Sequence, residues 1–224
     1  MLNKLSPTIA IVDSGIGGIS VLNKLIGRYQ SGNYIYFADN LYMPYGTKSK
    51  AEIKERILNI INNLKQNYQV DMIIIACNTA SSVLKNIDIN GVIKFEFNDK
   101  KATYLTTPLT QKNLKNVKTI SSSNLAREIE ENIFNISKVE KIVREEIKTH
   151  KLNKLDSLIL GCTHYELVED IFKRYCPKTK VSANSYNILD KIIYNPNTED
   201  LSIYFMTTKQ DMKYISMLKS LIKN

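Results

Sequence analysis

The chain has 224 residues, of which 43% are hydrophobic and 24% are charged. These values are ordinary for globular proteins, so they exclude a fibrous or wholly disordered chain. Basic residues outnumber acidic ones by 31 to 22, but acids are interspersed among the lysines and no basic run stands apart. This pattern argues against nucleic acid as a partner and is compatible with a small acidic substrate.

The sequence predicts a cytoplasmic protein without a membrane-spanning segment. No apolar run approaches the roughly 20 residues that cross a bilayer, and the first residues lack the apolar core of a signal peptide. The three cysteines are Cys77, Cys162 and Cys176. A small, odd number of cysteines indicates reduced thiols rather than a disulfide framework.

Short β-rich runs alternate with amphipathic stretches along the chain, which is typical of a doubly wound α/β fold. The apolar patterns predict strands at Thr8–Val12, Asn33–Ala38, Met72–Ala76, Val92–Phe97, Ala102–Leu105, Leu155–Leu160 and Ser202–Met206. They predict helices at Ile19–Tyr29, Ser49–Asn67, after Cys77-Asn78-Thr79, within Ser123–Lys148, from His164 to about Arg174, and from about Gln210 to Ile222.

One segment is repeated at a constant spacing. Asp71–Thr79 and Asp156–His164 each contain an acid, mostly apolar residues, a small residue, a cysteine and polar residues, and the offset between them is 85 residues. Ile11–Gly15 resembles Tyr104–Pro108 more weakly. Each cysteine therefore falls between a predicted strand and helix, where open α/β sheets place ligands and where the pKa of a thiol is lowered. We expect two related lobes, each with one cysteine on the wall of a shared cleft. Two such thiols could invert a chiral carbon without a cofactor.

Several motifs resemble the aspartate/glutamate racemase family, and in particular its glutamate racemases. The similarity covers nearly the whole chain and keeps the order of the family's segments. It rests on Asp13–Gly18, Pro44–Lys48, Ala76–Ser81 and Leu160–Tyr165, with weaker likeness at Thr106–Thr110 and Ile203–Thr208.

The resemblance implies two pseudosymmetric, doubly wound, flavodoxin-like lobes with mostly parallel sheets. The expected division assigns residues 1–88 and 183–224 to the first lobe and residues 89–182 to the second, with the active site in the cleft between them. The implied activity is the interconversion of L-glutamate and D-glutamate, which supplies D-glutamate for peptidoglycan. The resemblance implies no cofactor and no metal, and it allows a homodimer.

The resemblance also assigns roles to individual residues. It implies that Cys77 and Cys162 are the two acid/base groups, that Asp13 and His164 assist them, and, on a looser register, that Glu130 faces the site. The residues implied to bind substrate are Asp13, Ser14, Pro44, Tyr45, Gly46, Asn78, Thr79, Thr107, Thr163 and His164.

The chain departs from the family pattern in places. It is about one helix shorter between Ala80 and Thr107, Glu166 stands where a proline is usual, and the pattern near Ala183-Asn184-Ser185 is blurred. Two alternatives therefore stay open. The same thiols could racemise aspartate or another amino acid, or the chain could be a degenerate homologue that binds an acidic ligand or a protein partner without turnover.

Other readings of the polar residues carry less weight. Cys162, His164 and Cys176 match no common zinc spacing, so we expect Cys176 to be a buried apolar side chain. The glycines of Gly15–Gly18 lack the last glycine of the dinucleotide-binding motif and indicate a tight turn against the substrate. His150 lies in a charged stretch and is expected to be solvated.

Overall fold

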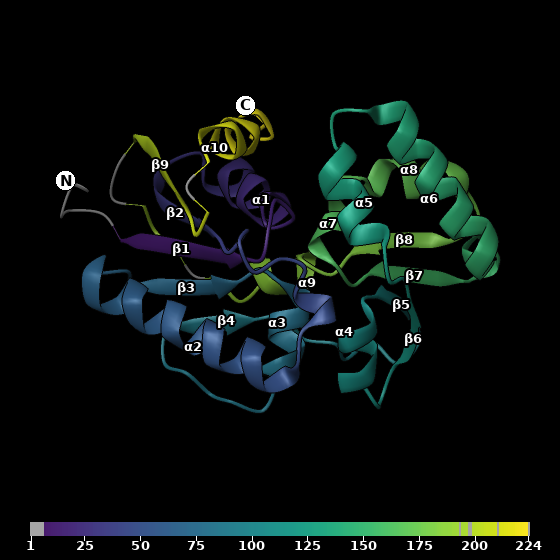
Figure 1. The fold of residues 1–224 in the computed structure, drawn as a ribbon, viewed down its shortest axis with the longest axis horizontal. Coiled ribbons are helices and arrows are strands. Elements are labelled where there is room, and N and C mark those ends of the chain that lie inside the picture. The colour runs from purple at the N-terminus through teal and green to yellow at the C-terminus, as the bar shows by residue number, and fades with distance from the viewer. Residues whose placement is uncertain (1–6, 193, 197–198, 210, 224) are drawn as a thin grey trace.

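The protein folds into two α/β lobes that lie side by side (Figure 1). The computed structural model describes residues 7–192, 194–196, 199–209 and 211–223. Residues 1–6 and Gln210, which the sequence-based predictions include, lie outside these ranges. Within the described ranges no helix is long and apolar enough to cross a membrane.

The first lobe is built on a five-stranded parallel sheet with the order β4-β3-β1-β2-β9. Its strands are β1 (Thr8–Asp13), β2 (Gly32–Ala38), β3 (Met72–Ile75), β4 (Val92–Lys94) and β9 (Leu201–Thr207). Its helices are α1 (Ile19–Tyr29), α2 (Lys50–Asn67), α3 (Asn78–Val83), α10 (Met212–Ser220) and the short 3-10 helix η1 (Tyr45–Thr47).

The second lobe is built on a four-stranded parallel sheet with the order β6-β5-β7-β8. Its strands are β5 (Thr103–Thr106), β6 (Lys118–Ser121), β7 (Ser157–Leu160) and β8 (Lys180–Ala183). Its helices are α4 (Pro108–Asn113), α5 (Leu125–Asn132), α6 (Ile136–His150), η2 (Leu152–Lys154), α7 (Thr163–Leu167) and α8 (Glu169–Tyr175). Helix α9 (Tyr186–Leu189) lies on the return to the first lobe (Figure 1).

The two sheets share one strand order, which confirms the predicted pseudosymmetric, doubly wound fold. Strands β2-β1-β3-β4 of the first lobe correspond to β6-β5-β7-β8 of the second, and β9 is added beside β2. The segment repeated at an offset of 85 residues ends β3 in one lobe and β7 in the other. Both cysteine segments therefore leave the carboxyl end of the third strand of their lobe.

Side-chain alternation along the strands divides the first lobe into two apolar layers. Ile9 and Ile11 of β1 pack on the side of α1, whereas Ala10 and Val12 pack on the side of α2. All six residues of β1 are buried, as expected for a central parallel strand covered on both faces. Helix α2 begins at a capping box between Ser49 and Glu52. Both faces of the first sheet are thus covered by helices, and the loops that follow its strands lie at one edge.

The segment that joins the lobes differs from its prediction. Val92–Lys94, which the expected division assigns to the second lobe, pairs as β4 with β3 of the first sheet. The next predicted strand, β5, pairs in the other sheet. The residues between them, including Phe95, leave one lobe for the other, and the Phe95 N–H donates to Ser81 Oγ at 3.1 Å.

Two predicted helices are each divided in the structure. The helix expected within Ser123–Lys148 is α5 followed by α6, because Asn135 interrupts it and caps α6 by accepting from the Lys138 N–H at 3.1 Å. The helix expected up to Arg174 is interrupted at Val168, where α7 ends and α8 begins. The chain crosses between the sheets once before β5 and returns once after β8.

Candidate active site

Cys77 and Cys162 line one cavity of about 180 Å³ between the lobes. Cys77 follows β3 and precedes α3, and Cys162 follows β7 and precedes α7. Both are buried and have free thiols. The cavity is also lined by Ser14, Met43, Pro44, Tyr45, Gly46, Thr47, Thr107, Pro108, Ser123, Ala126, Arg127, Thr163 and His164. Seven of the predicted substrate-binding residues thus lie in the same cavity as the two cysteines.

The Cys77 thiol lies in a buried environment that disfavours its ionisation. Its Sγ is 3.7 Å from Ser14 Oγ. Burial and the nearby Asp13 carboxylate raise the pKa of Cys77 to about 12, despite the opposing contacts from Ser14 and the Ala80 N–H. In the ligand-free protein Cys77 is therefore a thiol at neutral pH, ready to give a proton.

Asp13 lies at the end of β1 and reaches from the first lobe to the second. Its Oδ1 accepts from the Gly15 N–H at 2.9 Å, and its Oδ2 accepts from the Thr163 hydroxyl at 3.0 Å. Asp13 is fully buried, and burial raises its pKa even though the charge of His164 and these hydrogen bonds oppose the shift. Asp13 therefore connects the two cysteine-bearing walls through Thr163.

His164 lies between Cys162 and a buried carboxylate. Its Nδ1 is 3.9 Å from Cys162 Sγ, and its Nε2 is 2.5 Å from Glu130 Oε2. Burial alone would lower the pKa of His164, but its contacts with Cys162 and Glu130 outweigh burial and raise the pKa well above its usual range. The structure thus favours an imidazolium beside Cys162.

Glu130 supports His164 with partners from both lobes. It also accepts from the Ile16 N–H at 3.1 Å and from the Tyr214 hydroxyl at 2.7 Å. Burial would raise the pKa of Glu130, but the hydrogen bond and charge of His164, with Tyr214 and Ile16, hold the pKa below its ordinary value. Sequence reasoning gave no role to Tyr214, whose helix α10 belongs to the other lobe.

Three predicted substrate-binding residues lie beside Cys77 but differ in how they reach the cavity. The hydroxyls of Thr79 and Thr107 are 3.0 Å apart, and Thr107 lines the cavity. Asn78 Oδ1 accepts from Asn184 Nδ2 at 2.8 Å, whereas the buried Asn78 Nδ2 has no hydrogen-bond partner. Asn78 and Thr79 are not among the cavity-lining residues. An unpartnered buried donor beside Cys77 is a group that a bound substrate could satisfy.

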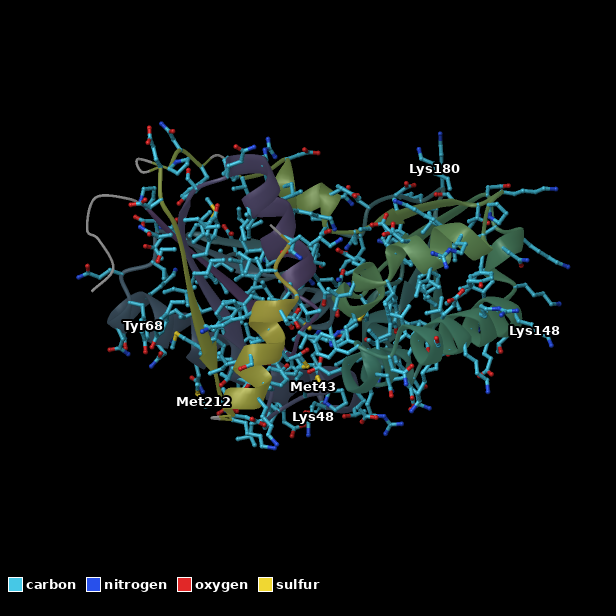
Figure 2. The ribbon with its side chains drawn as sticks, turned by 90° about the horizontal axis from the view of Figure 1, so that it is seen from above. Met43, Lys48, Tyr68, Lys148, Lys180 and Met212 are labelled. Carbon is cyan, nitrogen blue, oxygen red and sulfur yellow. The ribbon has the colours of Figure 1, made fainter. Side chains whose placement is uncertain are left out.

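The loop from Met43 to Thr47 forms part of the wall contributed by the first lobe, beside Ser14 and Cys77. Tyr45 is buried, and its hydroxyl donates to Asp39 Oδ2 at 2.7 Å. Asp39 in turn accepts two hydrogen bonds from Arg56, at 2.8 and 2.7 Å. In Figure 2, Met43 lies in the middle of the molecule, between Tyr68 of the first lobe and Lys148 of the second. The Asp39–Arg56 pair anchors this loop next to the second lobe.

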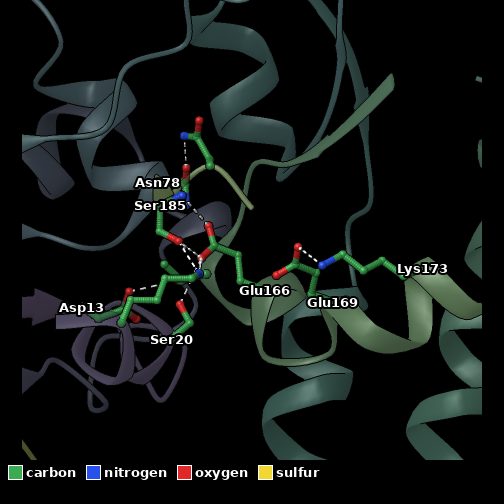
Figure 3. Close-up of polar contacts among 10 residues, drawn as sticks. Asp13, Ser20, Asn78, Glu166, Glu169, Lys173 and Ser185 are labelled. Atoms are coloured by element: carbon green, nitrogen blue, oxygen red, sulfur yellow. Dashed lines mark hydrogen bonds and ion pairs between the residues drawn. The ribbon is translucent and has the colours of Figure 1, made fainter. Parts of the chain in front are cut away.

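Glu166, the residue that departs from the family pattern, joins the two lobes through polar contacts (Figure 3) and is not among the residues that line the cavity. Its carboxylate accepts from Ser20 Oγ at 3.2 Å, from Lys24 Nζ at 3.1 Å and from the Ser185 N–H at 3.0 Å. Ser20 and Lys24 belong to α1 of the first lobe, and Glu166 to α7 of the second. We call these four residues the Glu166 cluster.

The remaining titratable candidates lie away from the cavity. Cys176 is buried in the apolar core of the second lobe, and burial raises its pKa. His150 lies 3.3 Å from Glu146 on α6, with its side chain 29% exposed. In the part of the chain that the structure describes, no group of three His, Cys, Asp or Glu side chains is arranged to hold a metal ion.

Comparison with known proteins places the chain among racemases. No protein-family model matches it. It is 30% identical to glutamate racemase 3 of Caldanaerobacter subterraneus subsp. tengcongensis, across 96% of this chain and 90% of that protein. It is 26% identical to the glutamate racemase of Clostridium botulinum across the full length of both.

Two solved structures illustrate the structural likeness. The glutamate racemase of Francisella tularensis in complex with D-glutamate matches with a TM-score of 0.74 and 25% identity, over 97% of this chain and 94% of that one. A glutamate racemase of Bacillus anthracis matches with a TM-score of 0.79 and 21% identity, over 96% and 93%. These matches extend over both lobes.

Proposed function

Because this chain belongs to the glutamate racemase family, we propose that it interconverts L-glutamate and D-glutamate with Cys77 and Cys162 as the two acid/base groups. The observation that carries the proposal is that both thiols line one cavity from equivalent strand ends of the two lobes. Its volume of about 180 Å³ is below the roughly 300–1,000 Å³ of sites for drug-sized ligands. The cavity is thus suited to a small amino acid.

The proposed reaction moves one proton on each side of the substrate. With the α-carbon between the sulfurs, the thiolate of one cysteine removes the α-proton, and the thiol of the other donates a proton to the opposite face. The two cysteines exchange these roles when the other enantiomer reacts. No electron acceptor is needed, because the carbanion formed in the first half is neutralised in the second.

The surrounding residues support the proton transfers in different ways. On the Cys77 side, the raised pKa of the thiol means that proton removal needs a neighbouring positive charge, which the ammonium group of the substrate brings. On the Cys162 side, the His164 imidazolium faces the sulfur and is held by Glu130. It favours negative charge on that sulfur. Asp13 and Ser14 position the first wall.

Racemisation assays test this proposal directly. Purified protein is given L-glutamate, D-glutamate or L-aspartate without added cofactor, and circular dichroism with chiral chromatography follows the enantiomers. We expect glutamate to racemise in both directions, and product formed in heavy water to carry α-deuterium from its first appearance. Racemisation of aspartate alone, of neither substrate, or with retention of the original proton would contradict the proposal.

Cysteine variants test the assignment of the two bases. We expect Cys77→Ala and Cys162→Ala each to abolish racemisation in both directions, because each turnover uses both thiols. Cys176→Ala serves as the matched control, because Cys176 is buried outside the cavity, and it should keep activity. Near-normal turnover by either of the first two variants would contradict the two-base mechanism.

The cellular role follows from the activity. D-glutamate made by this enzyme would supply peptidoglycan synthesis in the cytoplasm, where the three free thiols would stay reduced. A homodimer stays a prediction from the family resemblance.

A further inference from the structure

The segment that follows β8 carries a buried amide that the proposed mechanism does not use. Asn184 comes directly after β8 of the second lobe, and its side chain is fully buried. Its Nδ2 donates to Asn78 Oδ1 at 2.8 Å, although the two residues are 106 positions apart in sequence. Asn78 follows Cys77 and begins α3 of the first lobe. The end of the second sheet is therefore bonded to the residue beside one of the two thiols.

Three side-chain amides form a chain that has a single direction. Asn187 Nδ2 donates to Asn184 Oδ1 at 3.3 Å, so the oxygen of Asn184 is occupied and its nitrogen faces Asn78. An amide oxygen accepts and an amide nitrogen donates. Asn78 therefore turns its oxygen toward Asn184, and its Nδ2 is left as a buried donor without a partner among the described residues. The direction of the Asn78 amide is thus set by residues outside the cavity.

The Glu166 cluster holds the backbone that carries Asn184. Glu166 accepts from the N–H of Ser185, the next residue, at 3.0 Å (Figure 3). Lys24 of α1 donates to the side chains of both Glu166 and Ser185, and the Asn184 N–H donates to the Leu160 carbonyl at 3.3 Å. Glu166 and the segment around Asn184 both depart from the family pattern, and here they are in contact. Contacts from both lobes therefore leave the Asn184 amide little freedom to turn.

We propose that Asn184 is a positioning residue that orients the Asn78 amide, so that its unpartnered N–H group meets a carboxylate oxygen of the substrate beside Cys77. This inference rests on the proposed function. A buried donor without a partner destabilises the free protein, and a carboxylate oxygen is a strong acceptor for it. Asn184 would act through Asn78 without touching the substrate.

A double-mutant cycle tests this role, because a positioning residue acts only through the residue that it positions. Asn184→Leu keeps the approximate shape of the side chain but removes its N–H group. We expect it to lower kcat/KM for glutamate about 10- to 100-fold, as for loss of a hydrogen bond to a charged group. In an Asn78→Ala background the same substitution should change kcat/KM less than about twofold. Equal losses in both backgrounds would overturn the proposal.

Asn113→Leu is the matched control. Asn113 also reaches α3 from the second lobe, but its Nδ2 donates at 3.1 Å to Ser82 Oγ, one turn beyond Asn78. This variant should keep kcat/KM within about twofold of wild type. If it lost as much as Asn184→Leu, any amide bond onto α3 would have the same effect, and the proposed orientation of Asn78 would be rejected.

Ligand affinity provides a readout that does not depend on turnover. Calorimetry with L-glutamate should show the same coupling, with weaker binding by Asn184→Leu only where Asn78 is present. Asn184→Ala is taken through the same cycle, and chemical denaturation of each variant shows that it is folded at the assay temperature. The test therefore does not depend on the folding of the leucine variant.

The outcomes distinguish this inference from the proposed function. Wild-type protein that binds glutamate without racemising it overturns the proposed function, and the affinity cycle then decides about Asn184. Coupling between Asn184 and Asn78 in that cycle supports the inference. Independent effects, or no binding of glutamate to the wild type, overturn it. If wild type racemises glutamate and the effects are independent, the proposed function stands and the role of Asn184 is rejected.

Discussion

Gly17 allows the backbone of the first lobe to lie directly against Thr163 and His164 of the second. A Cβ at Gly17 would lie 2.5 Å from Thr163 Oγ and 2.7 Å from His164 Nδ1. We therefore expect Gly17→Ala to displace His164 and to lower kcat/KM by at least about 100-fold, because small displacements of catalytic groups cost that much. Steady-state racemisation measures the loss.

Gly27 provides the matched control for this substitution. It lies exposed on α1, and a Cβ there would meet no atom within 4 Å. Gly27→Ala should keep activity and stabilise the protein by about 0.5–1 kcal/mol, since alanine favours a helix interior. Equal activity of the two alanine variants would show that the contact of Gly17 with His164 is unimportant.

Cys77 is expected to make the protein less stable at alkaline pH. Its pKa is raised from about 9 to about 12 on folding. The buried thiol therefore costs no stability below pH 9. As the pH rises from 9 toward 12 the free energy of unfolding falls, because only the unfolded chain releases the thiol proton in that window. Between pH 8 and 11 we expect the free energy of unfolding of wild type to fall more than that of Cys77→Ser, by about 2–3 kcal/mol. Urea titrations at each pH measure this difference, and parallel pH profiles would contradict it.

Single residues were predicted from sequence where a local pattern marks them. The repeated segment indicated Cys77 and Cys162, and the motifs around them indicated Asp13 and His164. Arg127 and Tyr214 carry no such pattern. Their positions depend on how α5 and α10 pack across the two lobes, and that packing is a tertiary property that a single sequence does not display.

At the scale of elements, the Glu166 cluster joins α1 to α7 by a buried ion pair. The side chain of Glu166 is fully buried and that of Lys24 is 18% exposed. Removal of one charge leaves the other without its partner, so we expect Glu166→Gln to lower the free energy of unfolding by about 1–3 kcal/mol. Chemical denaturation measures the change.

Glu169 is the matched control for Glu166 (Figure 3). It pairs with Lys173 one turn along α8 at 2.9 Å, where the lysine side chain is 48% exposed. Glu169→Gln should cost less, about 0.5 kcal/mol, because water can solvate the half-exposed ammonium of Lys173 when its partner is lost. If both glutamine variants lost the same stability, the ion pair between the lobes would have no special role.

Strands whose residues are buried on both faces were predicted from the sequence, whereas edge strands were missed. Central strands such as β1 and β7 are apolar over most of their length and were predicted from that pattern. The missed strands, β6 and β8, are the two edges of the second sheet; β6 has one apolar residue among its four, and β8 alternates polar and apolar residues. Helix α4 was also missed, although Thr107 caps it and Pro108 occupies its first turn, which is a recognisable helix start.

At the scale of the whole molecule, the return of the chain to the first lobe has a consequence for the order of folding. Strand β9 pairs with β2 over seven registered positions, although the two strands are about 170 residues apart in sequence. The strands of the second lobe pair within a much shorter stretch of chain. Closing a long loop costs entropy before its contacts are made, so the β2–β9 pairing should form late.

Pulse-labelled hydrogen exchange during refolding can measure this order. We expect amides of β5 and β7 to become protected before those of β9, and protection of β9 first would contradict the argument. Tyr214 follows β9 in the chain, and its hydroxyl reaches Glu130 of the second lobe. The full set of contacts around His164 would then be completed only in the last step of folding, so a nascent chain would acquire the proposed activity only once both lobes have folded.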